Sequence, residues 1–106
     1  MAAYASTVTL DMPKVNKMAG GNALGMIMGL CNLTNYNSTR VEITAITGRI
    51  KGAPRVIAEG ISSNGIGIRW DVASKAFKAY VLTTGAEVAN DVNVGSFGFI
   101  AVGVAP

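Results

Sequence analysis

Six side-chain carboxylates are the residues of this chain best suited to acid–base chemistry. They are Asp11, Glu42, Glu59, Asp71, Glu87 and Asp91. A glycosidase needs two carboxylates on either side of one scissile bond, and nothing in the spacing of these six selects such a pair. Charged side chains are mostly exposed to solvent, and several of the six fall in expected turns. We therefore interpret them as solvated or turn-capping groups.

Nucleophilic chemistry finds little support in the sequence. The chain has no histidine and a single cysteine, Cys31. The lack of histidine excludes a His-containing zinc site, a His-dependent triad and a Cys-His dyad. No Ser-x-x-Lys motif or phosphate-binding loop occurs, and Asp91-Val92-Asn93 is too sparse for a calcium loop. Because Cys31 lies in an apolar run, it is typical of a small buried residue. The sequence thus predicts no enzyme, no cofactor and no metal.

Two aromatic residues, Trp70 and Tyr80, are the remaining candidates for contact with a small ligand. Either ring could stack on a sugar or a base. Trp70, however, belongs to a segment of alternating apolar residues, where an aromatic side chain is more often part of the core. A carbohydrate-binding module therefore remains an alternative hypothesis.

The composition favours one folded domain that associates with other proteins. A chain of 106 residues fits a single domain, expected here over residues 1–106. Half of the residues are hydrophobic and 14% are charged. This composition argues against intrinsic disorder and favours oligomers or docked subunits. The net charge is +3, but the basic residues are dispersed, with the densest group at Arg49, Lys51 and Arg55. This dispersion argues against specific nucleic-acid binding.

The most apolar stretch, Met18–Leu33, raises the question of a membrane span. It carries no charge and has glycines at Gly21, Gly25 and Gly29, a spacing found in paired membrane helices. The stretch is shorter than the roughly 20 residues that a span requires. We expect instead a glycine-containing loop and then a buried strand over Leu24–Leu33. The first residues lack the features of a signal peptide, so synthesis in the cytoplasm is expected.

Alternation of apolar and polar residues predicts β-strands along most of the chain. The expected strands are Ser6–Leu10, Leu24–Leu33, Val41–Ile50, Arg55–Ile61, Gly65–Trp70, Lys75–Leu82 and Val94–Val104. Gly52-Ala53-Pro54 should end the strand Val41–Ile50 before the strand Arg55–Ile61 begins. Asn64-Gly65 should form a tight turn. The last strand has two apolar faces, so it should be central or covered by a neighbour. The pattern predicts an all-β fold, an antiparallel β-sandwich of jelly-roll type.

The segment around the expected hairpin resembles small structural proteins of tailed-bacteriophage virions. The resemblance rests on Asn64-Gly65, on the run from Trp70-Asp71 to Phe77-Lys78-Ala79-Tyr80, and on the final pattern Phe99-Ile100-Ala101-Val102-Gly103. It covers about residues 30 to 104.

The resemblance implies a capsid decoration (cement) protein, which stabilises the phage head by bridging capsomers. Its expected partners are the major capsid protein and further copies of itself, as a homotrimer on the outside of the virion. Residues 1–23 could be an extended N-terminal arm that contacts a neighbouring subunit. The candidate capsid or subunit contacts are Met26, Met28, Arg49, Lys51 and Arg55. A tail or fibre-associated module is the alternative within the virion.

Overall fold

The computed structural model describes residues 3–11, 16–17 and 24–104, and most of the regular structure in these ranges is β-strand. The elements are β1 (Ala5–Leu10), β2 (Asn16–Lys17), β3 (Leu24–Asn35), α1 (Thr44–Thr47), β4 (Lys51–Ala58), β5 (Gly67–Asp71), β6 (Ala76–Tyr80) and β7 (Gly95–Val104). The predicted all-β class is confirmed.

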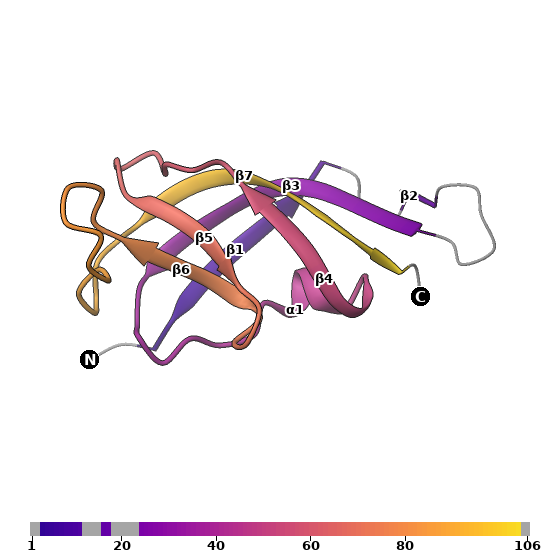
Figure 1. The fold of residues 1–106 in the computed structure, drawn as a ribbon, viewed down its shortest axis with the longest axis horizontal. Coiled ribbons are helices and arrows are strands. Elements are labelled where there is room, and N and C mark those ends of the chain that lie inside the picture. Colours follow the sequence, from indigo (N-terminus) through magenta and orange to yellow (C-terminus); the bar gives the residue numbers. More distant parts are fainter. Residues whose placement is uncertain (1–2, 12–15, 18–23, 105–106) are drawn as a thin grey trace.

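A five-stranded antiparallel sheet carries the long strands (Figure 1). Its order is β1-β3-β7-β4, and the short β2 also pairs with β3. β7 lies between β3 and β4, with which it pairs along most of its length. The predicted central position of the last strand is confirmed, although Ile100 on one of its two apolar faces is exposed.

The strands β5 and β6 form a separate two-stranded sheet, the hairpin that the sequence predicted. A tight turn precedes it, in which Gly65 takes a positive φ of 75°. Between the strands, the Asp71 carboxylate accepts the N–H of Ala73. The hairpin turn is thus closed by a side chain typical of turns.

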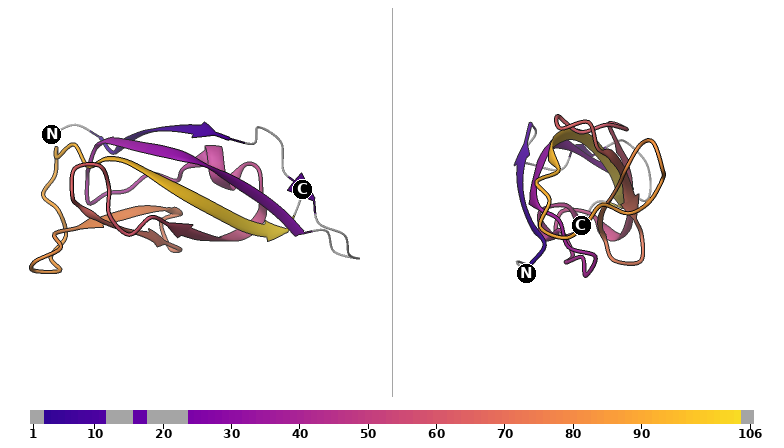
Figure 2. Two further views of the ribbon diagram at one scale, coloured as in Figure 1. Left: turned by 90° about the horizontal axis from the view of Figure 1, so that it is seen from above. Right: turned by 90° about the vertical axis from the view of Figure 1, so that its left-hand side faces the viewer.

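The core lies between the hairpin and the large sheet. The Phe77 ring of β6 packs edge-on against Phe97 of β7, with ring centroids 4.8 Å apart, and against Trp70 at 5.0 Å. Ile27 and Leu33 of β3 are fully buried in the same core. Seen end-on, the strands curve around this centre (Figure 2). One face of the large sheet is therefore covered, and the other faces outward.

The predicted strand over Val41–Ile50 is wrong, because part of it forms the single helical turn α1. The N–H groups of Thr47 and Gly48 donate to the carbonyls of Ile43 and Thr44. Ile43, Ile46 and Ile50 are buried, and their spacing of three and four residues matches a helical period. The alternation of Val41 and Ile43 favours a strand, whereas the helical spacing allows all three isoleucines to be buried. The segment therefore forms a helical turn.

The predicted break at residues 52–54 is also wrong, since β4 runs through it from Lys51 to Ala58. The register of β4 against β7 shifts between Lys51 and Arg55. Pro54 thus lies where the regular ladder is interrupted, which is where a strand tolerates a residue without an N–H.

Within the apolar stretch, residues Leu24–Leu33 belong to strand β3, as predicted, and the residues before them lie outside the described ranges. No helix in the described ranges is long and apolar enough to cross a membrane. β3 is buried on one face only, since Met28 and Leu30 are exposed. Of the segment 1–23, residues Ala5–Leu10 form β1 of the domain's own sheet, whereas 1–2, 12–15 and 18–23 lie outside the described residues.

Candidate functional site

The outward side of the five-stranded sheet, here called the outer face, exposes large apolar side chains. Met28 of β3 lies opposite Ile100 of β7, which lies opposite Ile57 of β4. These three side chains, here called the apolar row, are 37%, 43% and 74% exposed. Cross-strand neighbours on one face stand about 5 Å apart, so the row is continuous. Leu30, two residues from Met28 on the same face, extends it and is also exposed.

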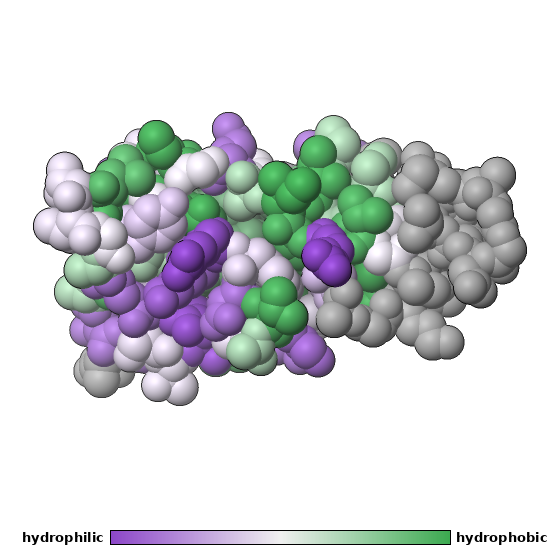
Figure 3. Space-filling view, viewed as in Figure 1, coloured by the Kyte–Doolittle hydropathy of each residue, from purple (hydrophilic) through white to green (hydrophobic). Residues whose placement is uncertain are grey.

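Charged groups border the apolar row. Arg55 and Glu59 flank Ile57 along β4 and are exposed. The Glu59 carboxylate accepts the N–H of Gly98, which holds it against the sheet. Beside the row lies an open depression of about 420 Å³, whose lining includes the apolar residues Met28, Ile57 and Ile100 and the acidic residues Asp11 and Glu59. Hydrophobic surface over the region of β4 and β7 and hydrophilic surface over the hairpin are visible in Figure 3.

Three of the five contact residues predicted from sequence lie on the outer face. Met26 is two residues from Met28 on β3, and its cross-strand partner Val102 lies opposite Arg55. Arg49 is exposed in the turn after α1, away from this row. The backbone of Lys51 begins β4, and its side chain lies outside the description. The sheet register therefore brings together Met26, Met28 and Arg55.

A cluster of polar side chains around Arg40 joins three loops. The guanidinium lies 2.9 Å from the Asp71 carboxylate and 2.7 Å from that of Glu87. It also donates to the hydroxyls of Tyr36 and Ser74. Arg40 follows β3, and Glu87 follows β6. Asp71 ends β5, and Ser74 lies in the turn between β5 and β6. One cation therefore ties the hairpin to the segment that leaves the large sheet.

The pKa shifts of Asp71, Tyr36 and Arg40 are explained by burial and by contacts within this cluster. A hydrogen bond from Ser74, assisted by Arg40 and opposed by partial burial, lowers the pKa of Asp71. Burial, and a hydrogen bond to Glu87, raise the pKa of Tyr36. Burial opposes the charge on Arg40, but its bonds to Tyr36 and Asp71 outweigh this and raise its pKa. Within the described residues, every buried side-chain nitrogen and oxygen has a partner. We interpret the cluster as a structural clasp.

The sequence does not predict this clasp. Asp71 and Glu87 are expected there as turn-capping or solvated groups, and Arg40 has no predicted role. The three residues are separated by 31 and 16 positions along the chain, so no local pattern links them. The sequence indicates that Asp71 accepts hydrogen bonds in a turn, but it does not indicate which cation Asp71 binds.

The two aromatic residues considered for ligand stacking lie on opposite faces of the hairpin. Trp70 is paired with Phe77 across the strands and packs against its ring, on the side of the core. Tyr80 is paired with Gly67, and its ring lies so close to that glycine that an added Cβ would stand 2.4 Å from it. Arg69 lies over the same ring at 6.0 Å. Trp70 and Tyr80 therefore do not form one stacking platform.

The remaining reactive group, Cys31, is fully buried in the core. Burial raises the pKa of its thiol to about 12, so the thiolate that would act as a nucleophile is scarce at neutral pH. In the described part of the chain, no three His, Cys, Asp or Glu residues are grouped as metal ligands. The exposed apolar row is thus the strongest candidate for a functional surface.

Comparison with known proteins gives no assignment, because no family model, no curated protein and no solved structure matches the chain.

Proposed function

We propose that this chain is a structural subunit that docks through its outer face onto a large protein assembly, as a decoration protein on the exterior of a phage head. The single observation that carries the proposal is the apolar row Met28–Ile100–Ile57 on the outer face. Contiguous exposed apolar surface with a polar border is typical of protein-binding sites.

The shape of the outer face favours a protein partner over a small molecule. The depression beside the row is open to solvent, whereas small-molecule sites enclose most of their ligand. Arg55 and Glu59 border the Ile57 end of the apolar row, and charged groups at the margin of an apolar centre are usual in protein interfaces. Docking of a rigid sheet requires no catalytic group.

Stabilisation of a shell follows from mass action. A protein that binds the assembled shell but not its separated subunits shifts the equilibrium toward assembly. In this role the apolar row supplies the buried contact, and Arg55 with Glu59 sets orientation against charges on the capsid protein. The proposed location is the outside of the virion, after synthesis in the host cytoplasm.

We also propose that the two sheets form a β-sandwich related to jelly rolls. Support comes from the packing of Phe77 of the hairpin against Phe97 and Phe99 of the large sheet. Trp70 and Tyr80 lie on opposite faces of the hairpin, and this separation favours the docking role over the carbohydrate-binding alternative.

Binding to phage heads that lack this chain tests the proposed function. Such heads are prepared from a phage whose copy of the gene is deleted, mixed with purified protein and sedimented. The wild type should co-sediment with heads, and Ile57→Glu should weaken binding at least about tenfold, as expected for a residue at the centre of an interface.

The matched control is Leu82→Glu, which places the same charge at an exposed apolar residue in the turn after β6. It should bind like the wild type, and both variants should melt near the wild-type temperature. Wild-type protein that stays in the supernatant, or that attaches to tails and not to heads, contradicts the proposal.

A further inference from the structure

We propose that the free edge of β1 pairs with the same edge of a second copy of this chain, antiparallel and centred on Val8. β1 is an edge strand of the large sheet, with β3 on its one side. No described residue pairs with its other side. The inference concerns the assembly of the protein with itself, and it goes beyond the proposed docking on a shell.

The register identifies which backbone groups of β1 face the free edge. The N–H of Asp11 donates to the carbonyl of Met28 at 2.9 Å, and Asp11 continues the register in which Leu10 lies opposite Gly29. In an antiparallel ladder, hydrogen-bonded pairs alternate with pairs that bond outward. Thr9 and Thr7 therefore bond to β3, and the intervening residues present their N–H and C=O groups outward. Those residues are Ser6, Val8 and Leu10.

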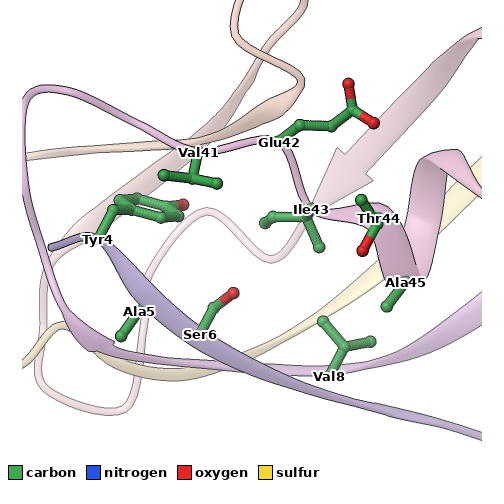
Figure 4. A pocket seen from close by; sticks show the side chains of 9 residues that line it. All are labelled: Tyr4, Ala5, Ser6, Val8, Val41, Glu42, Ile43, Thr44 and Ala45. Atoms are coloured by element: carbon green, nitrogen blue, oxygen red, sulfur yellow. The ribbon is translucent and has the colours of Figure 1, made fainter.

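A cavity of about 310 Å³ lies beside this edge, between β1 and the segment Val41–Ala45. Figure 4 shows the side chains of Ser6 and Val8 rising from β1 toward Ile43 and Ala45. Val8 is half-buried, and Val41 on the far side of the cavity is 55% exposed. A strand added to β1 would place its own inward side chains over this cavity and complete the burial of Val8.

The geometry of β1 allows it to pair with a second copy of itself about a two-fold axis. The residues that bond outward, Ser6, Val8 and Leu10, are evenly spaced about Val8. A two-fold axis at Val8 therefore pairs Ser6 of one copy with Leu10 of the other. In this register the outward N–H and C=O groups of all three residues form hydrogen bonds. On the outer face the same axis sets Thr7 opposite Thr9 of the second copy. Threonine pairs are favourable across antiparallel strands. No charged residue occurs in β1, so no like-charge pair opposes the contact.

The edge also lacks the features by which single proteins prevent strand pairing. Such edges usually carry lysine, proline or an inward charge, or are covered. β1 reads Ala-Ser-Thr-Val-Thr-Leu, with one irregularity between Ala5 and Ser6 and regular pairing from Ser6 onward. Because a two-fold axis closes the contact on itself, the product is a dimer. It therefore differs from the homotrimer that the phage resemblance implies.

Charge placement at Thr7 and Thr9 tests this register specifically. Both side chains are exposed and are directed away from the core, so substitution should leave the fold intact, as circular dichroism and melting will report. Sedimentation velocity should show a wild-type dimer. The double variants T7K/T9K and T7E/T9E place like charges opposite each other twice, and each should raise the dissociation constant about tenfold or more.

Two complementary arrangements should restore pairing. The variant T7K/T9E sets lysine opposite glutamate in both pairs and should dimerise like the wild type. An equal mixture of T7K/T9K and T7E/T9E should form the mixed dimer, visible by native mass spectrometry. A wild type that sediments as a monomer at its highest soluble concentration overturns the proposal. So does an oligomer whose dissociation constant is the same in all four proteins.

Discussion

Replacing Arg40 by methionine removes the charge of the clasp but keeps most of the aliphatic length of the side chain. The guanidinium is 16% exposed and makes ion pairs at 2.9 Å and 2.7 Å with Asp71 and Glu87. Exposed pairs contribute about 0–1 kcal/mol, whereas breaking a fully buried pair costs about 3–5 kcal/mol. The clasp lies between these limits. We therefore expect Arg40→Met to lower the free energy of unfolding by about 2 kcal/mol.

Urea denaturation at pH 7 measures this loss, with Arg69→Met as the matched control. Arg69 is exposed on the hairpin and faces the Tyr80 ring rather than a carboxylate. Exposed substitutions of this kind change stability by about 0.5 kcal/mol or less. If Arg40→Met and Arg69→Met cost the same small amount, the interpretation of the cluster as a clasp is refuted.

The stability lost in Arg40→Met should depend on pH. The pKa of Asp71 is lowered in the folded protein, chiefly by Ser74 and also by Arg40. A lowered carboxyl pKa contributes stability that is present above the unfolded value of about 3.9 and is lost as the pH falls through the folded pKa. The wild type should therefore exceed Arg40→Met in free energy of unfolding by the largest amount at pH 7. This difference in free energy should decrease below about pH 4. A difference that grows on acidification contradicts the assignment.

Three further predictions concern the core. Phe77→Ala should lower the free energy of unfolding by about 3–5 kcal/mol, as expected for a fully buried ring, while Val72→Ala at an exposed site should change it little; equal losses in urea titrations would contradict the packing. Tyr4→Phe should lower the free energy of unfolding by about 1–3 kcal/mol, because the Tyr4 hydroxyl donates to the Phe77 carbonyl and accepts the Phe77 N–H. An unchanged urea midpoint would show that these two hydrogen bonds do not stabilise the fold. Cys31 should react with a thiol reagent only as fast as the protein unfolds, since it is buried; immediate labelling of native protein at pH 8 would show that it is accessible.

Local patterns predicted the hairpin because its determinants are adjacent in sequence. The alternation of Ile66, Ile68 and Trp70, and the turn at Asp71, are set by neighbours within a few residues. The central position of β7 followed in the same way from its two apolar faces.

Features that depend on distant residues could not be predicted. The clasp needs the fold before Arg40 meets Asp71 and Glu87. The apolar row exists because the register sets Met28 opposite Ile100 and Ile57, and no single strand indicates this. α1 formed where alternation and helical spacing competed over one segment, and the burial of Ile46 decided between them.

Cryo-electron microscopy of phage heads decorated with this chain tests whether the outer face docks on the shell. We expect density on the outside of the shell, with the outer face of β3, β7 and β4 against the capsid protein and Ile57 buried at the contact. Density in which the hairpin faces the shell and the apolar row faces solvent, or heads that carry no added density, would contradict it.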